Sequence, residues 1–277
     1  MIIKTLVENT AASDGFGSEH GLSLYIETEK CRLLFDVGAS GLFYDNARKL
    51  GVEIEDIDYL IISHGHYDHG GGLKTFLEKN SKAEVFIHHL AFGKHYAKRS
   101  ECEPEFIGLD EELVGHRQLV FTSERFFIGR GIQLFSNVVQ SEPGPASNSG
   151  LFSEQDGEMV KDSFAHEQNL IIEEGDQAIL VTGCAHNGII NIIKHFYSLK
   201  ASMPDCVIGG FHLSGRSSGA NRKSEEMSTV DKIGKYLLDT NTKYYTGHCT
   251  GLEAYNRLKA IMGDNIEYLA AGSEITI

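Results

Sequence analysis

The chain has 277 residues, of which 41% are hydrophobic and 23% are charged, and its formal net charge is −14. This composition is that of a packed globular chain and excludes long disorder and a fibrous protein. The negative charge disfavours nucleic acid as a partner, and no apolar run approaches the ~20 residues that a membrane span needs.

The first third of the chain is predicted to alternate strands with helices. The opening run MIIKTLV breaks at Glu8, before it reaches the length of a signal-peptide core, and is therefore expected to be a strand. Gly51 is expected to end the first helix. The predicted strands are 1–8, 22–28, 31–38, 57–63 and 83–89, and the predicted helices are 42–51 and 73–80.

Residues 90–130 are less regular and richer in charge, and they are expected to form an insertion or a lid. Strand-like stretches resume around 118–122 and 131–139. The turn-rich segment 141–150 is the best internal boundary, but it is short for a domain linker. We therefore expect a single domain over residues 1–277.

The remainder of the chain is predicted to contain a hairpin followed by alternating helices and strands. Gly175-Asp176 provides the hairpin turn, and Asn187 and Thr250 are expected to cap the helices that follow them. The strands are 169–174, 177–183, 205–213 and 242–248, and the helices are 187–199, one ending near 239, and a last one after Thr250. This succession favours a layered α/β sandwich over a regular βαβ repeat.

Cysteine usage indicates a reducing compartment. The five cysteines, at positions 31, 102, 184, 206 and 249, are an odd number without close pairing. That pattern argues against a disulfide framework and leads us to expect a cytoplasmic protein. Cys31 and Cys206 lie on apolar strands and are expected in the core.

The segment SHGHYDHGGG carries the densest group of metal-ligand side chains. His64 and His66 are two residues apart in an extended stretch, so both can reach one ion. A turn at Tyr67 would bring Asp68 and His69 to a second ion. Neutral imidazoles and carboxylates are usual zinc ligands. A surface loop rich in histidine is the weaker interpretation, because the group follows a buried strand directly.

Several later apolar strands are also followed directly by a histidine. Each such residue alone could instead be a capping or packing side chain, but together they are what a site at one sheet edge needs. Among the other histidines, which are expected to be structural or exposed, only His20 could reach the site from a loop. Cys249 is expected to face away from it. The strand-end candidates are Cys184, His186, His212, His248 and, just before a strand, His166.

These motifs resemble the metallo-β-lactamase superfamily. The pattern H-x-H-x-D-H is present at residues 64–69, and LFDVG at 34–38 resembles that superfamily's strand-end aspartate motif. The resemblance implies a four-layer αββα sandwich with a dimetal site at one edge. Within the superfamily, GCAHNGIINI, GGFHL and HCTG resemble a narrower group whose named activity is dihydropterin–ribofuranosylaminobenzene phosphate synthase.

The resemblance also implies a ligand set for two divalent metal ions. His166 falls where the superfamily has a histidine before a hairpin, and Cys184 replaces the usual bridging aspartate. His186 could replace His166, and spacing does not decide between them. Zinc suits these donors best, with iron or manganese as alternatives. The expected ligands are His64, His66, Asp68, His69, His166, Cys184 and His248.

Three functions are compatible with such a site. The first is a hydrolase in which metal-activated water attacks an ester, lactone or phosphoester, with Asp68, His186 and His212 as catalytic residues. The second is a transferase that joins a dihydropterin to a ribofuranosylaminobenzene phosphate, with Tyr67, Phe211 and Tyr245 as candidate aromatic walls. The third is a redox or metal-sensing role.

The expected partner is a small anionic molecule, with neither nucleic acid nor a membrane involved. Arg216, Arg222 and Lys223 lie in a Gly/Ser-rich loop and could bind a phosphate or carboxylate of the substrate. Alternatively, these three cationic side chains simply belong to a solvent-exposed loop and have no binding role. The sequence does not indicate the oligomeric state.

Overall fold

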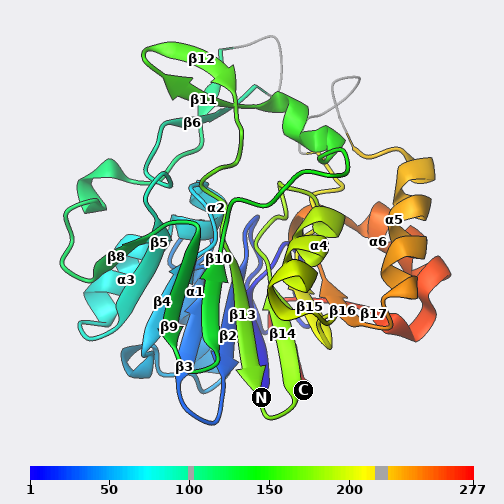
Figure 1. The fold of residues 1–277 in the computed structure, drawn as a ribbon. Helices are drawn as coiled ribbons and strands as arrows, with labels where there is room; N and C mark the ends of the chain where they lie inside the picture. The colour runs from blue at the N-terminus through cyan, green and yellow to red at the C-terminus, as the bar shows by residue number, and fades with distance from the viewer. Residues whose placement is uncertain (99–102, 216–223) are drawn as a thin grey trace. The chain divides into compact units, whose positions relative to one another are not determined.

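A computed structural model describes residues 1–98, 103–215 and 224–277, and the chain divides into two compact units (Figure 1). The first unit comprises Met1–Gly93, Gly108–Phe126 and Leu269–Ile277, and the second comprises Lys94–Ile107 and Phe127–Tyr268. Among the helices in these described ranges, none has the length and apolar character needed to cross a membrane.

A mixed sheet and short helices build the first unit. Its strands are β1 (Ile2–Val7), β2 (Ser23–Glu27), β3 (Arg32–Phe35), β4 (Tyr59–Ile62), β5 (Glu84–His88), β8 (Leu119–Thr122) and β18 (Glu274–Thr276). Its helices are α1 (Leu42–Lys49), α2 (Tyr67–Gly70) and α3 (Leu73–Lys79), with 3-10 turns at Ile54–Asp56 and Glu111–Leu113. The order is β18-β1-β2-β3-β4-β5-β8. Pairing is antiparallel from β18 to β3 and parallel from β3 to β8.

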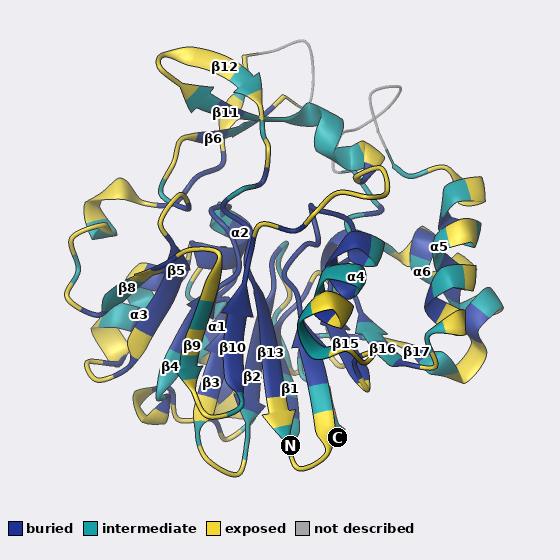
Figure 2. Ribbon diagram, in the orientation of Figure 1, coloured by how far each residue is buried: buried dark blue, intermediate teal, exposed yellow. Residues whose placement is uncertain are grey.

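The core of the first unit lies between this sheet and helices α1 and α3. Phe43 of α1 and Phe76 of α3 join one hydrophobic cluster with Leu34, Leu60 and Val85 of the parallel strands. These strands are apolar at nearly every position, and Figure 2 shows them as buried along most of their length. Each such side chain contributes about 1.5–3 kcal/mol through burial, so the strand ends are held on a rigid base.

The second unit contains another seven-stranded mixed sheet, together with three longer helices. Its strands are β9 (Arg125–Gly129), β10 (Ile132–Phe135), β13 (Asn169–Glu174), β14 (Gln177–Val181), β15 (Cys206–Gly209), β16 (Lys243–Thr246) and β17 (Ile266–Tyr268). The helices are α4 (Ile189–Lys200), α5 (Met227–Asp239) and α6 (Leu252–Met262), with 3-10 turns at Ala146–Gly150, His248–Thr250 and Gly263–Asn265. The order is β17-β16-β15-β14-β13-β10-β9. β14 to β17 pair in parallel, whereas β10, β13 and β14 pair antiparallel.

The core of this unit forms where the helices cover the sheet. Ile192 and Phe196 of α4, Leu237 of α5 and Leu258 of α6 belong to one buried cluster with Tyr244 of β16. The predicted hairpin is confirmed, because Glu174 of β13 pairs with Gln177 of β14 around a two-residue turn. Gly175 has φ 61°, which a glycine adopts without strain.

A four-stranded antiparallel sheet also belongs to the second unit and was not predicted as such. It has the order β12-β11-β6-β7, with β6 (His95–Ala97), β7 (Glu105–Phe106), β11 (Leu151–Gln155) and β12 (Glu158–Lys161). The strands β6 and β7 come from the segment 90–130 that was expected to be an insertion or a lid.

Both predicted helix caps are wrong. Helix α4 begins after Gly188 and α6 after Gly251, neither with a side-chain cap. The Asn187 amide instead donates to Glu167, and Thr250 Oγ1 accepts from the backbone N–H of Phe211. Cys206 is buried as expected, but Cys31 precedes β3 and is only partly buried.

Candidate metal centre

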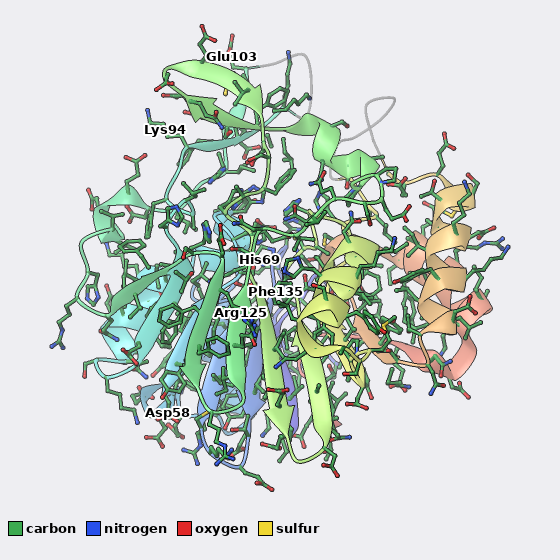
Figure 3. All side chains as sticks on the ribbon, viewed as in Figure 1. Asp58, His69, Lys94, Glu103, Arg125 and Phe135 are labelled. Atoms are coloured by element: carbon green, nitrogen blue, oxygen red, sulfur yellow. The ribbon has the colours of Figure 1, made fainter. Side chains whose placement is uncertain are left out.

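The ligand-bearing residues of the first unit follow strand β4. Figure 3 shows Asp58, which precedes β4, and His69, which follows it, near opposite ends of the strands. His66 keeps an extended backbone (φ −96°, ψ 144°) and helix α2 starts at Tyr67, where a turn was predicted. His64 therefore lies in a bend just after β4, His66 is extended, and the helical turn carries Asp68 and His69.

The four side chains lie as two pairs of ligand atoms. His64 Nε2 is 3.1 Å from His66 Nδ1, and His69 Nε2 is 3.8 Å from the nearer carboxylate oxygen of Asp68. Two nitrogen ligands of one tetrahedral zinc ion are about 3.3 Å apart, because each Zn–N bond is about 2.0–2.1 Å. The first unit alone thus presents two half-shells of the spacing that a metal ion requires.

Asp36, which follows β3, orients these imidazoles through hydrogen bonds. Its carboxylate accepts hydrogen bonds from His69 Nδ1 at 2.6 Å and from the Ser63 hydroxyl and backbone N–H, both at 2.7 Å. The Ser63 hydroxyl in turn accepts from His64 Nδ1 at 2.8 Å. Since both Nδ1 atoms carry the proton, the Nε2 atoms of His64 and His69 keep the lone pair that binds a metal. Asp36 is fully buried and has φ 61°.

His20, the one remaining histidine considered able to reach the site, lies beside Asp68. Its Nε2 is 3.0 Å from the Asp68 carboxylate. The loop can approach this closely because Gly21 follows, where a Cβ would lie 2.6 Å from the backbone oxygen of Asp68. This contact brings His20 beside a predicted site residue, as the sequence had left open.

In the second unit, Cys184, His186 and His212 form one group. Their ligand atoms all lie within 4.8 Å of one another, and the His186 and His212 ring centroids are 4.1 Å apart. Phe164 stacks on His186 at 4.4 Å. Asn148 donates its amide to the His186 carbonyl and so turns its Oδ1 toward His186 Nδ1, 3.0 Å away. Nδ1 then carries the proton, and Nε2 is available as a ligand or base.

A second group of the same unit combines Cys184 with His248 and Cys249. Their ligand atoms also lie within 4.8 Å of one another, so the expectation that Cys249 faces away from the site is wrong. Burial opposes ionisation of the Cys249 thiol, but hydrogen bonding with Cys184 and His212 and the charge of His248 outweigh it and hold its pKa well below the ordinary value. His212 and His248 have φ of 51° and 50°, a conformation that bulky residues rarely adopt.

Glu167, which the sequence reasoning passed over, supports the loop after β14. Its fully buried carboxylate accepts from the backbone N–H of His186 at 2.6 Å and of Asn187 at 2.9 Å, and from the Asn187 amide at 2.8 Å. Burial raises the pKa of Glu167, although these hydrogen bonds work in the opposite direction. The adjacency of Glu167 to His166 was the only signal available for it in the sequence.

His166 lies in a different group of this unit, with His95 and Asp162. His95 Nδ1 donates to Asp162 at 2.9 Å, His166 Nε2 lies 3.4 Å from the same oxygen, and the two rings are 4.0 Å apart. Burial alone would raise the pKa of Asp162, but the hydrogen bonds from His166 and His95 lower it well below its ordinary value. Burial lowers the pKa of His166 and favours its neutral, ligating form.

Most of the predicted site residues therefore lie close to other predicted site residues of the same unit. His186, not His166, accompanies Cys184. His95, expected to be structural or exposed, is buried, contacts Asp162 and lies beside His166. The three cations predicted to bind an anion, Arg216, Arg222 and Lys223, lie outside the described residues.

The donor set fits a divalent transition metal. Buried imidazoles held by second hydrogen bonds, one carboxylate and thiols are the groups that bind zinc or iron, whereas magnesium prefers oxygen. Both ring nitrogens of His212 are buried. Neither has a hydrogen-bond partner among the residues that the structure describes. A buried polar atom in that state is expected to meet an ion, a water or a ligand.

Comparisons with known proteins agree on one family. The sequence profile of the metallo-beta-lactamase superfamily matches residues 17–187. An uncharacterized protein of Methanocaldococcus jannaschii is 32% identical over an alignment of 281 positions that covers 100% of this chain and 100% of that one. The 7,8-dihydropterin-6-methyl-4-(beta-D-ribofuranosyl)-aminobenzene-5'-phosphate synthase of the same organism is 31% identical over 296 residues, covering 99% of this chain and 95% of that one.

Solved structures show the same likeness. Tm1679, described as a metal-dependent hydrolase of the beta-lactamase superfamily, has a TM-score of 0.84 at 30% identity, covering 100% of this chain and 99% of that one. Zn(2+)-bound PqqB from Methylobacterium extorquens has a TM-score of 0.59 at 12% identity, covering 100% of both chains. The second likeness concerns the fold alone.

Proposed function

The chain belongs to the metallo-β-lactamase superfamily and has its α/β fold, and from this premise we propose that it is a metal-dependent hydrolase of an ester, lactone or phosphoester of a small anionic substrate. The observation that carries the proposal is the pairing of ligand atoms after β4, at 3.1 Å and 3.8 Å. Burying several imidazoles side by side costs free energy unless their nitrogens are engaged, so this pairing supports a metal-binding role.

Each unit supplies its own support for the proposed ligands. The Nε2 lone pairs of His64 and His69 support this role in the first unit, and the proximity of Cys184 to His248 supports it in the second. Two divalent ions, zinc foremost, would supply Lewis acidity and lower the pKa of water toward neutrality. The full proposed set is His64, His66, Asp68, His69, His166, Cys184 and His248.

Other residues of the chain would handle protons and substrate. His186 is held by the Phe164 ring and by Asn148, so its Nε2 can give a proton to a leaving group. His212 is proposed for the same role or for binding an oxyanion, and Asp68, beside His20, for moving a proton. Arg216, Arg222 and Lys223 are proposed to bind the substrate's anionic group.

Metal analysis paired with a substrate panel tests this proposal. We expect one to two zinc, iron or manganese ions per purified chain, and hydrolysis of at least one phosphoester, lactone or thioester. Asp68→Ala should abolish activity, whereas Asp58→Asn, at the other end of β4, should not. A metal-free protein that stays inactive after addition of each of the three metals would contradict the proposal.

A synthase activity is the second candidate, favoured by the relative of that name that matches 99% of this chain. The metal would then polarise a pterin group that leaves as a C–N bond forms. Phe211 is fully buried in the core cluster and cannot serve as a wall of a pterin site, whereas Tyr67 and Tyr245 are partly exposed. Saturable quenching of pterin fluorescence by the protein would support this candidate, and hydrolysis without pterin affinity would exclude it.

A further inference from the structure

We infer that His20 is a positioning residue for Asp68, and that the long loop between β1 and β2 holds this imidazole against the Asp68 carboxylate. The inference deepens the proposed function and rests on it for the role of Asp68 as a metal ligand. From the sequence, His20 was only a residue that could reach the site from a loop. The loop, His20 and Asp68 all belong to the first unit.

The Asp68 carboxylate lies between two imidazoles. Its Oδ2 atom is 3.0 Å from His20 Nε2 and 3.8 Å from His69 Nε2. An ionised carboxylate only accepts hydrogen bonds, so His20 Nε2 carries the proton and donates to Oδ2. His69 Nε2 keeps its lone pair, because the proton of that ring is on Nδ1. The N–H of His20 therefore holds the oxygen that faces the lone pair of His69.

This hydrogen bond opposes an unfavourable contact. A carboxylate oxygen and an imidazole lone pair are both electron-rich, and they repel each other unless a cation lies between them. Rotation of the Asp68 side chain would relieve the repulsion before an ion binds, and it would also separate the two ligand atoms. The charge-assisted bond from His20 keeps Oδ2 in place. Asp68 then meets an ion in the orientation that binds it, so less ordering is needed on binding.

The same segment also holds the backbone of Asp68. The N–H of Leu22 donates to the Asp68 carbonyl at 3.2 Å. Gly21 lies between His20 and Leu22 in the chain, and a Cβ there would lie 2.6 Å from that carbonyl oxygen. Residues 20–22 therefore fix both the main chain and the side chain of Asp68, and a glycine at position 21 is what allows the approach.

Two anchors hold the loop just before His20. Asn46 of α1 is fully buried and grips Gly17, donating to its carbonyl at 2.8 Å and accepting from its N–H at 3.1 Å. The Glu19 carboxylate accepts from the backbone N–H of Ser40 at 3.1 Å and from its hydroxyl at 2.6 Å. His20 therefore leaves a fixed point of the chain, which limits the positions that its ring can take.

The length of the loop also points to a role beyond connection. β1 and β2 are antiparallel neighbours, which about two to five residues can join. The structure instead places residues 8–22 between them. Ordering a longer connection costs conformational entropy that the joining of two strands does not require. Delivery of His20 and Gly21 to Asp68 accounts for the extra length.

A simple surface ion pair is the alternative role of this contact. The side chain of His20 is 23% exposed and that of Asp68 is 12% exposed, so water screens the contact only in part. If the contact served stability alone, removal of His20 would lower the unfolding midpoint and leave the zinc affinity unchanged. If His20 positions Asp68, the zinc affinity falls. The two roles therefore differ in a quantity that can be measured.

Zinc competition with a chromophoric chelator separates the two roles. His20→Ala should bind zinc about 10- to 100-fold more weakly at one site, as is typical when a residue that orients a ligand is lost. His20→Gln keeps an N–H donor and should restore the affinity to within about three-fold of the wild type. His116→Ala is the matched control, because His116 is a partly exposed histidine of the same unit, and it should leave the affinity unchanged.

The hydrogen bond itself can be measured in the wild type without a metal. In imidazole NMR spectra of the metal-free chain, assigned with His20→Gln, His20 should carry its proton on Nε2, and that proton resonance should shift in Asp68→Asn. A proton on Nδ1 instead would overturn the inference. This measurement keeps the test decisive if His20→Ala does not fold, which circular dichroism would show.

The outcome is separable from that of the proposed function. An active hydrolase in which folded His20→Ala binds zinc as tightly as the wild type overturns this inference alone. A chain whose zinc affinity depends on His20, but which hydrolyses nothing on the substrate panel, overturns only the hydrolase.

Discussion

Replacing Asp36 by Asn tests whether the buried carboxylate beneath the first-unit imidazoles sets their metal-binding form. The two oxygens of Asp36 accept three hydrogen bonds, from His69 Nδ1, the Ser63 hydroxyl and the Ser63 backbone N–H. An Asn keeps one oxygen, which the Ser63 N–H requires. Its amide then faces His69 Nδ1 and can only donate, which forces the proton of His69 onto Nε2.

The expected effect follows from this change of tautomer. A histidine with Nε2 protonated cannot bind a metal through that atom, and loss of a residue that orients a ligand typically weakens metal binding 10- to 100-fold. This corresponds to about 1.4–2.8 kcal/mol. Loss of a hydrogen bond to a charged acceptor lowers the free energy of unfolding by about 1.5–3 kcal/mol. The variant should therefore fold, with weakened zinc affinity.

Competition with a chromophoric chelator measures the zinc affinity, and circular dichroism confirms the fold. Asp58→Asn is the control, because Asp58 also accepts a backbone N–H, that of Arg32 at 2.9 Å, at the other end of the strands. It should lose some stability but no zinc affinity. If Asp36→Asn binds zinc as tightly as the wild type while its unfolding midpoint falls, Asp36 is a packing residue and the reasoning is wrong.

Three further predictions concern stability. Glu167→Gln leaves one buried N–H donor unpaired and should lower the free energy of unfolding by about 1–3 kcal/mol in urea titrations; equal stability would contradict this. Gly210→Ala places a methyl group 2.4 Å from the Cys249 sulfur and should lower the free energy of unfolding by about 1–3 kcal/mol in the same assay; an unchanged value would contradict this. The Arg257 hydrogen bond lowers the pKa of Asp231, so this ion pair should stabilise the fold at neutral pH. Its contribution, measured against Asp231→Asn, should be lost as pH falls from about 3.9 through the lower pKa of the folded state, and a difference independent of pH would refute it.

The buried strands could be predicted because their sequence pattern is strong. Strands such as β4 and β14 are short apolar runs that end at a polar motif, and the hairpin turn has a glycine where a positive φ is needed. The expected fold class is confirmed by family membership. By contrast, β11 and β12 are half exposed, and three-residue strands such as β17 carry too few residues for a pattern.

The sequence allowed the candidate site to be predicted only where the residues concerned are close neighbours in the chain. The pairing within residues 64–69 follows from neighbouring positions, and the structure shows it. Cys249 was misjudged because adjacent residues of an extended strand face opposite sides, whereas β16 ends at Thr246 and the chain then turns at His248. The predicted helix cap at Asn187 was wrong because the Asn187 side chain donates to the buried carboxylate of Glu167 instead. Whether the reaction is hydrolysis stays a prediction.

The two units share one strand plan, and that plan explains why distant sequence positions gather ligand-type residues. In the first unit an antiparallel pair, β2 and β3, leads into parallel β3, β4 and β5, and in the second β13 and β14 lead into parallel β14, β15 and β16. Parallel neighbours must be joined by crossovers, so their carboxyl ends share one edge of the sheet. The loops leaving that edge carry residues with a left-handed backbone, Asp36 after β3, His212 after β15 and His248 after β16. Strain at these positions is tolerated because the fully buried strands beneath them are rigid, so the loops at this edge can hold ligand-type side chains in backbone conformations that a less rigid base would not maintain.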